Sequence, residues 1–351
     1  MIPARTIRVA RAVLALAVGG ALALLVLEGI SRWYFNYRSV YDPVLGSVVE
    51  PGHTFRSRVE GDGVARYDKG GARRAASLGP RTGLTILCIG DSFTEAFQVT
   101  DDEVYTTLVE RALDTAGVPA AVLNVGRSGL SVADYVANAP TYRTTSAPAW
   151  TVVQVTGRDF YEETWQTHRT HFRRTCPACP VDVVRVPPVP DDSLRVFMRW
   201  LRNQSALVGF SLHRWQELTG ATRRNSQPAP PDPRVFAKTA WPGEFPVKEE
   251  LRMLAEAFDG RLTILLLGRF DPLDPGRDTR EEAVIKQAAR ELGVSLACSK
   301  DEHEGLAEKG LAPYGFPNTS LNSGHMNAQG HAAAARALTR ELLKLHAEGK
   351  L

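Results

Sequence analysis

The sequence predicts an α/β protein with a parallel β-sheet that helices cover on both faces. From residue 84 onward, short apolar runs alternate with longer segments of helical periodicity. The first run, Leu84 to Ile89, is apolar without interruption, which is typical of a strand buried on both faces. Alternation of this kind implies right-handed helical crossovers between parallel strands. The chain has 351 residues, of which 44% are hydrophobic and 23% are charged, as in ordinary globular proteins.

The expected elements follow this alternation in order. After the first strand, residues 101–116 open with acidic side chains and place Val104, Leu108 and Leu113 on one side, as an amphipathic helix does. The same reasoning gives further strands at 121–125, 150–155, 261–268 and 293–298, and further helices at 247–258, 279–292 and 327–345.

An uncharged segment near the N-terminus predicts a membrane anchor. Ala12 to Leu27 carries no charge and follows three arginines. Its helix spans only about 24 Å, so it must continue to the aromatic residues at 33–35 to cross a hydrocarbon core of roughly 30 Å. A cleaved signal peptide is the alternative, but no small-x-small cleavage site follows the apolar run. We expect residues 1–35 to form a cytoplasmic tip and an uncleaved signal-anchor, with the remaining chain outside the cytoplasm.

Two segments flank or interrupt the alternation. Residues 36–80 are rich in glycine, arginine and turn-forming residues, and we expect an irregular juxtamembrane segment there. The α/β domain then occupies residues 81–351. Within it, the proline-rich stretch at about 160–245 is expected to be an insertion that packs on the main sheet and contains one helix, at 193–218.

A CxxC pair lies within this insertion. In an oxidising compartment, Cys176 and Cys179 are expected to form a local disulfide. The alternative is a zinc site completed by His168 and His171, whose spacing is tighter than the usual zinc-finger pattern. We expect a disulfide or free thiols and no metal.

Polar, turn-forming residues follow the expected strands at their carboxyl ends. A GDS sequence ending at Ser92 follows the first strand, NVGRSG at 124–129 follows the second, and TGRDF at 156–160 follows the third. These ends meet at the sheet edge where open α/β folds bind ligands. Together with a late histidine, His325, they favour nucleophilic acyl transfer, in which the histidine takes the serine proton. The alternatives are that Ser92 only caps the next helix and that His325 is structural.

These motifs resemble the SGNH (GDSL-type) hydrolase superfamily, whose members are esterases and O-acyltransferases. The resemblance covers residues 81–351 and rests on GDSFTE, then NVGRSG, then a late histidine followed by NAQGH. It implies a flavodoxin-like three-layer sandwich with a parallel sheet. The anchor and the sequences YDPVLG and LRNQSAL are similar to membrane-anchored bacterial members, which are often associated with envelope polysaccharides.

The resemblance also implies roles for individual residues. Ser92 matches the nucleophile and His325 the general base. Gly126 matches the glycine whose N–H joins that of Ser92 in the oxyanion hole. His331, in the last expected helix, is expected to be structural.

Two positions depart from the family pattern. The family has an oxyanion asparagine where this chain has Arg158, whose guanidinium offers donors and a positive charge in its place. The aspartate expected shortly before the histidine is replaced by Ser323 and Asn322, either of which offers a hydrogen bond to the imidazole. Alternatively, a carboxylate comes from Asp301, Glu302 or Glu304.

We therefore expect a membrane-anchored SGNH-type esterase or O-acyltransferase that acts on an extracytoplasmic glycan or glycolipid by a Ser-His mechanism, without a cofactor or metal. The net charge of +3, with scattered basic residues, gives no reason to expect a nucleic-acid partner. The alternative is a catalytically degenerate protein of the same fold that serves as a carbohydrate-binding or envelope-assembly module.

Overall fold

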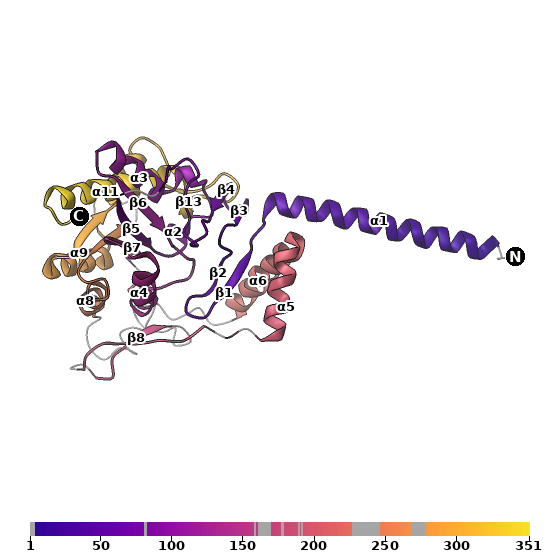
Figure 1. The fold of residues 1–351 in the computed structure, drawn as a ribbon, viewed down its shortest axis with the longest axis horizontal. Coiled ribbons are helices and arrows are strands. Elements are labelled where there is room, and N and C mark those ends of the chain that lie inside the picture. Colours follow the sequence, from indigo (N-terminus) through magenta and orange to yellow (C-terminus); the bar gives the residue numbers. More distant parts are fainter. Residues whose placement is uncertain are drawn as a thin grey trace.

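A parallel five-stranded sheet forms the centre of the domain (Figure 1). The computed structural model describes residues 4–80, 83–157, 159–160, 170–176, 179–188, 190, 192–226, 246–268 and 278–351. In sheet order the strands are β11 (Ser295–Cys298), β10 (Leu262–Leu267), β7 (Trp150–Thr156), β5 (Leu84–Ile89) and β6 (Ala120–Asn124). Because β5 precedes β6 in the chain, the order is 2-1-3-4-5, which is the flavodoxin-like arrangement. The predicted fold class is confirmed.

Helices pack on both faces of this sheet. One face carries α3 (Tyr105–Thr115) and α11 (Ala328–Ala347), and the other carries α4 (Val132–Ser146), α8 (Val247–Ala257) and α9 (Arg280–Leu292). Within the described connections lie the short helices α2 (Ser92–Glu95), the 3-10 helix η1 (Asp101–Glu103) and α10 (Lys300–Ala307). The sequence pattern gave no prediction for α4, which has little amphipathic character and contains Pro140.

The segment expected to be irregular contains two β-hairpins. Strand β1 (Ser39–Asp42) pairs with β2 (Gly46–Val49), and β3 (Thr54–Ser57) pairs with β4 (Gly63–Arg66). The glycines that suggested irregular chain lie largely in the turns, where their positive φ angles are needed. The prediction was wrong because such short strands leave little room for an alternating pattern.

In the described part of the insertion, two helices occupy the region where one was expected. Helix α5 (Ser193–Gln204) ends at Ser205, whose backbone is extended, and α6 (Ala206–Ser226) follows at once. The carboxylate of Glu28 accepts hydrogen bonds from the Ser205 hydroxyl and from the first two N–H groups of α6. The expected packing on the main sheet is also wrong for these helices, because α6 lies against α1 and α5 against β1. A small hairpin of β8 (His171–Arg173) and β9 (Asp182–Val184) contacts α4.

The N-terminal helix α1 (Ala4–Tyr34) projects from the domain (Figure 1). Its portion Thr6–Tyr34 is long and apolar enough to cross a membrane, and the most apolar 18-residue stretch within it has no buried residue. The side of the membrane on which the domain lies, and whether α1 is retained in the mature protein, stay predictions.

The CxxC pair forms a disulfide. Cys176 and Cys179 are bonded to each other, so their sulfurs are not available as thiolate ligands. His171 lies in β8 and is buried, and His168 lies outside the described residues. Among the residues that the structure describes, no cluster of metal-binding side chains occurs.

Candidate functional site

Ser92 lies at the carboxyl edge of the sheet, as the first residue of α2. Gly90 and Asp91 form the turn from β5, and an added Cβ at Gly90 would lie 2.1 Å from Thr94 Oγ1. The helix cap is Asp91, whose Oδ1 accepts a hydrogen bond from the Phe93 N–H at 2.9 Å. Burial raises the pKa of Asp91, and the Phe93 N–H acts in the opposite direction. Because Asp91 supplies the cap, Ser92 is not the capping residue of α2. Its hydroxyl has a different partner.

That partner is His325. The histidine lies in β13 (Leu321–Met326), which pairs with β12 (Tyr314–Gly315) just before α11. Its Nε2 is 2.9 Å from Ser92 Oγ, although 233 residues separate the two positions. The ring packs at 5.4 Å from the ring of Phe93, and its side chain is 28% exposed. The structure therefore brings together the two residues that sequence analysis assigned as nucleophile and base.

The other ring nitrogen contacts a carboxylate that sequence analysis missed. Glu60 lies in the turn between β3 and β4, and its Oε2 is 2.5 Å from His325 Nδ1. Its Oε1 accepts the backbone N–H of His325 at 3.0 Å. Burial alone would raise the pKa of Glu60, but the hydrogen bonds from the side chain and backbone of His325 outweigh it and hold the pKa below its usual value.

The three side chains form a continuous hydrogen-bonded line. An ionised Glu60 carboxylate can only accept a hydrogen bond, so Nδ1 of the neutral imidazole carries the N–H. The lone pair is then on Nε2, which faces Ser92. In this tautomer the imidazole can accept the serine proton, and the carboxylate can stabilise the imidazolium that results. The geometry can thus activate a serine hydroxyl for attack on an electrophilic carbon.

Two residues in or near β13 accommodate Glu60: Gly324 leaves space for its carboxylate, and Asn318 binds the turn that carries it. Gly324 has a φ of +84°, and a Cβ there would lie 2.4 Å from Glu60 Oε1. Asn318 donates to the carbonyl oxygens of Arg58 and Gly61 and accepts the Gly61 N–H at 2.9 Å. The turn that carries Glu60 is therefore fastened on both sides to the chain around His325.

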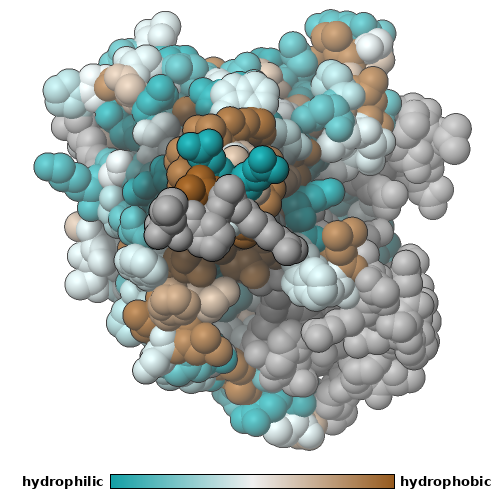
Figure 2. Space-filling model, turned by 90° about the vertical axis from the view of Figure 1, so that its right-hand side faces the viewer, coloured by the Kyte–Doolittle hydropathy of each residue, from teal (hydrophilic) through white to brown (hydrophobic). Residues whose placement is uncertain are grey.

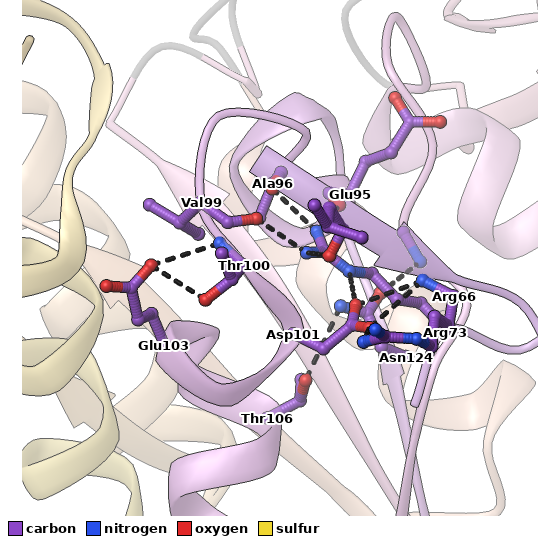
Figure 3. A network of polar contacts seen from close by, with 12 residues as sticks. Arg66, Arg73, Glu95, Ala96, Val99, Thr100, Asp101, Glu103, Thr106 and Asn124 are labelled. Atoms are coloured by element: carbon purple, nitrogen blue, oxygen red, sulfur yellow. Dashed lines mark hydrogen bonds and ion pairs between the residues drawn. The ribbon is translucent and has the colours of Figure 1, made fainter. Parts of the chain in front are cut away.

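A buried arginine fixes the chain that follows α2 (Figure 3). Arg73 precedes β5 and is only 3% exposed. Its guanidinium donates to the carbonyl oxygens of Glu95, Ala96 and Val99 at 2.6–2.8 Å and pairs with Asp101 at 2.8 Å. These contacts satisfy backbone groups in a segment without regular structure, and they hold the short helix of Ser92 against the sheet.

Gly126, whose N–H the resemblance implies in the oxyanion hole, follows β6. This N–H donates to Asn124 Oδ1 at 2.9 Å. The absence of a side chain matters, because a Cβ at Gly126 would lie 2.5 Å from the Glu95 nitrogen. Asn124 also donates to the Thr94 carbonyl at 2.6 Å. The NVGRSG sequence thus supports α2 by close packing.

The other candidates for orienting His325 do not contact its ring. Ser323 and Asn322 are exposed, and Glu60 occupies the Nδ1 side that they were expected to fill. Of the carboxylates on α10 that were the alternative partners of the ring, Glu302 forms ion pairs with Arg336 and Arg340. Asp301 and Glu304 lie with Glu302 on α10, while Arg158 lies outside the described residues. The sequence offered one weak signal for Glu60, an acidic residue between two glycine-containing turns.

Two further titratable groups lie beneath the site. His331 is buried in α11, and burial lowers its pKa to about 3, in keeping with the structural role expected for it. Glu95 is buried at the end of α2, and its carboxylate accepts hydrogen bonds from the backbone and hydroxyl of Ser128. Burial raises the pKa of Glu95 to about 7, despite those bonds and the nearby arginines.

Comparisons with known proteins found structural similarity only. No protein-family model and no curated protein sequence matches the chain. Among solved structures, an acetylxylan esterase, Axe2, from Geobacillus stearothermophilus is 15% identical, with a TM-score of 0.41 over 76% of this chain and 96% of that one. LAE5, an alpha/beta hydrolase from the metagenome of Lake Arreo, is 13% identical, with a TM-score of 0.39 over 74% and 95% of the chains. TesA is 15% identical, with a TM-score of 0.39 over 74% and 99%.

The pKa of Glu95 predicts how stability depends on pH. Because folding raises this pKa, the folded state holds the proton more tightly, and stability falls as pH rises from about 4.5 to about 7. The loss should be on the order of 3 kcal/mol, since one pKa unit corresponds to about 1.4 kcal/mol. Thermal unfolding at pH 5 and pH 8 should show this loss in wild type and much less of it in Glu95→Gln. An equal pH dependence in both proteins would contradict the assignment.

Proposed function

We propose that this protein is a serine-dependent esterase or O-acyltransferase whose catalytic residues are Ser92, His325 and Glu60. The observation that carries the proposal is the continuous hydrogen-bonded line from the Ser92 hydroxyl through the imidazole to the Glu60 carboxylate. The alternative of a catalytically degenerate module rests on two departures from the family pattern: Arg158, which lies outside the described residues, and the missing carboxylate beside the histidine. Glu60 supplies that carboxylate from the N-terminal part of the chain.

The proposed reaction has two steps. Ser92 Oγ attacks the ester carbonyl while His325 Nε2 takes its proton, and the Ser92 backbone N–H stabilises the developing oxyanion. When the intermediate collapses, the protonated imidazole gives its proton to the departing alcohol and leaves an acyl-serine. A water molecule or an acceptor hydroxyl then attacks the acyl group, with His325 as base, and restores Ser92. The choice between water and hydroxyl separates hydrolysis from transfer.

We further propose that the substrate is an acylated glycan or glycolipid outside the cytoplasm, close to the membrane surface. The turn that carries Glu60 is joined to the end of α1 by Arg58. Its N–H donates to the Tyr34 carbonyl at 3.0 Å, and its guanidinium lies 3.8 Å from the centre of the Trp33 ring. Glu60 follows Arg58 by two residues, and two residues of chain reach at most about 7 Å. Glu60 is therefore near the end of the proposed membrane span.

The nucleophile and the acid can be tested by substitution. A serine-directed fluorophosphonate should label wild type, and Ser92→Ala should abolish labelling. Glu60→Gln keeps the shape of the side chain but removes its charge, so it should lower kcat for acyl esters by about 10,000-fold, as the loss of the orienting acid does in serine proteases. Glu60→Asp is the conservative control and should retain more activity than Glu60→Gln. Labelling that survives in Ser92→Ala would overturn the role of this serine.

The fit between Gly324 and Glu60 gives a second test. Gly324→Ala should displace the Glu60 carboxylate, because the new Cβ would lie 2.4 Å from it, and should slow labelling by at least about 100-fold. Gly310→Ala is the matched control, since Gly310 has a similar φ of +72° but open space around its Cβ position. Both variants should lose stability because of the positive φ, and Gly324→Ala should lose more because of the added clash. Equal labelling rates in the two variants would contradict the positioning of His325 by Glu60.

A further inference from the structure

Helix α5 exposes apolar side chains along one side. Leu194, Phe197 and Trp200 are 68%, 52% and 55% exposed. They are spaced three residues apart, so they lie on one side of the helix. Large apolar side chains in such a row are uncommon on the surface of a soluble domain.

The polar side of the same helix faces the protein. Asn203 accepts the backbone N–H of Ser39 and donates to its carbonyl oxygen, at 3.1 and 2.9 Å. Arg199 lies over the ring of Tyr41, with its guanidinium carbon 5.4 Å from the ring centre. Helix α5 therefore turns Arg199 and Asn203 to the β1–β2 hairpin, while its row of large apolar side chains points outward. Val196, on the side of Arg199 and Asn203, is exposed as well, at 52%.

The contact between Glu28 of α1 and the start of α6 places the end of α5 at a defined height relative to a membrane crossed by α1. The span Thr6–Tyr34 has 29 residues, or about 43 Å of helix, close to the roughly 40–45 Å of a bilayer with its headgroups. Glu28, which binds the elbow between α5 and α6, lies about 9 Å from the outer end of that span. Because the hydrocarbon core is roughly 30 Å thick, its outer boundary lies about 6–7 Å from the same end. The elbow is therefore at the boundary between acyl chains and headgroups.

The arrangement in space agrees with this height. In Figure 1, α5 runs across the direction of α1, at the end of the domain from which α1 projects. Figure 2 looks onto that end and shows the hydrophobic atoms of α1 end-on, with further hydrophobic atoms below them. On α6, Trp215 and Leu218 add exposed apolar area, at 66% and 63%.

We propose that α5 is an interfacial membrane helix whose apolar side is immersed among the lipids of the leaflet from which the domain emerges. This inference rests on the membrane anchoring proposed above and does not depend on catalysis. A helix that exposes a row of large apolar side chains suits the headgroup–acyl boundary, where its apolar side enters by about 5–10 Å. With α1 it gives the domain two attachments, which fix the height of the Ser92 edge above the bilayer.

The test uses the full chain in phosphatidylcholine vesicles whose acyl chains carry bromine close to the headgroups, since bromine quenches tryptophan on contact. Trp200 is one of six tryptophans, so Trp200→Phe should lower the quenched fraction of emission by up to the share of one tryptophan. Trp150→Phe is the control, because Trp150 is 6% exposed within the central sheet. That substitution should remove emission that bromine does not quench.

Flotation of the vesicles separates this inference from the anchoring. Protein that floats with the vesicles and has a smaller quenched fraction in Trp200→Phe than in wild type supports the inference. Protein that floats, with the same quenched emission in wild type and Trp200→Phe, overturns the interfacial helix and leaves the anchor intact. Protein that does not float overturns both. None of these results depends on enzyme activity, so the proposed catalysis is tested separately.

Discussion

The paired hydrogen bonds between Glu60 and His325 are the interaction on which the site depends. They join a turn near the N-terminus to the last strand of the chain, 265 residues later. One carboxylate binds both the backbone and the ring of the histidine, so it fixes the position of β13 and the tautomer of the imidazole together. Without it, the charge that forms on the imidazole would lose this carboxylate partner.

Several positions around this contact are restricted to glycine, because a side chain there would clash with neighbouring atoms. Gly324 has to be glycine because a Cβ would occupy the place of Glu60 Oε1. Gly61 and Gly63 are similarly restricted, since Cβ atoms there would lie 2.2 Å from the Gln98 carbonyl oxygen and 2.0 Å from that of Phe97. The turn with Glu60 is therefore wedged between β13 and the chain after α2. Residues that look like a linker in the sequence form one wall of the site.

Sequence reasoning succeeded where the structure is determined locally. The apolar run of β5, the turn before Ser92 and the approximate bounds of most helices follow from patterns within a few residues. The pairing of Ser92 with His325 was predicted from the polar residues at the strand ends together with a family resemblance. Glu60 could not be predicted in this way, because its role depends on a contact between distant parts of the chain, and it lies outside the region that carries the resemblance. The break at Ser205 was missed for the same reason, since Glu28 of α1 causes it.

The most direct test of this account is a double-mutant cycle between Glu60→Gln and His325→Ala, read as the rate at which a fluorophosphonate labels Ser92. If Glu60 acts through the imidazole, Glu60→Gln should slow labelling strongly when His325 is present and have almost no effect when His325 is alanine. Equal slowing in the two backgrounds would mean that Glu60 acts independently of His325, and would contradict the proposed catalytic line.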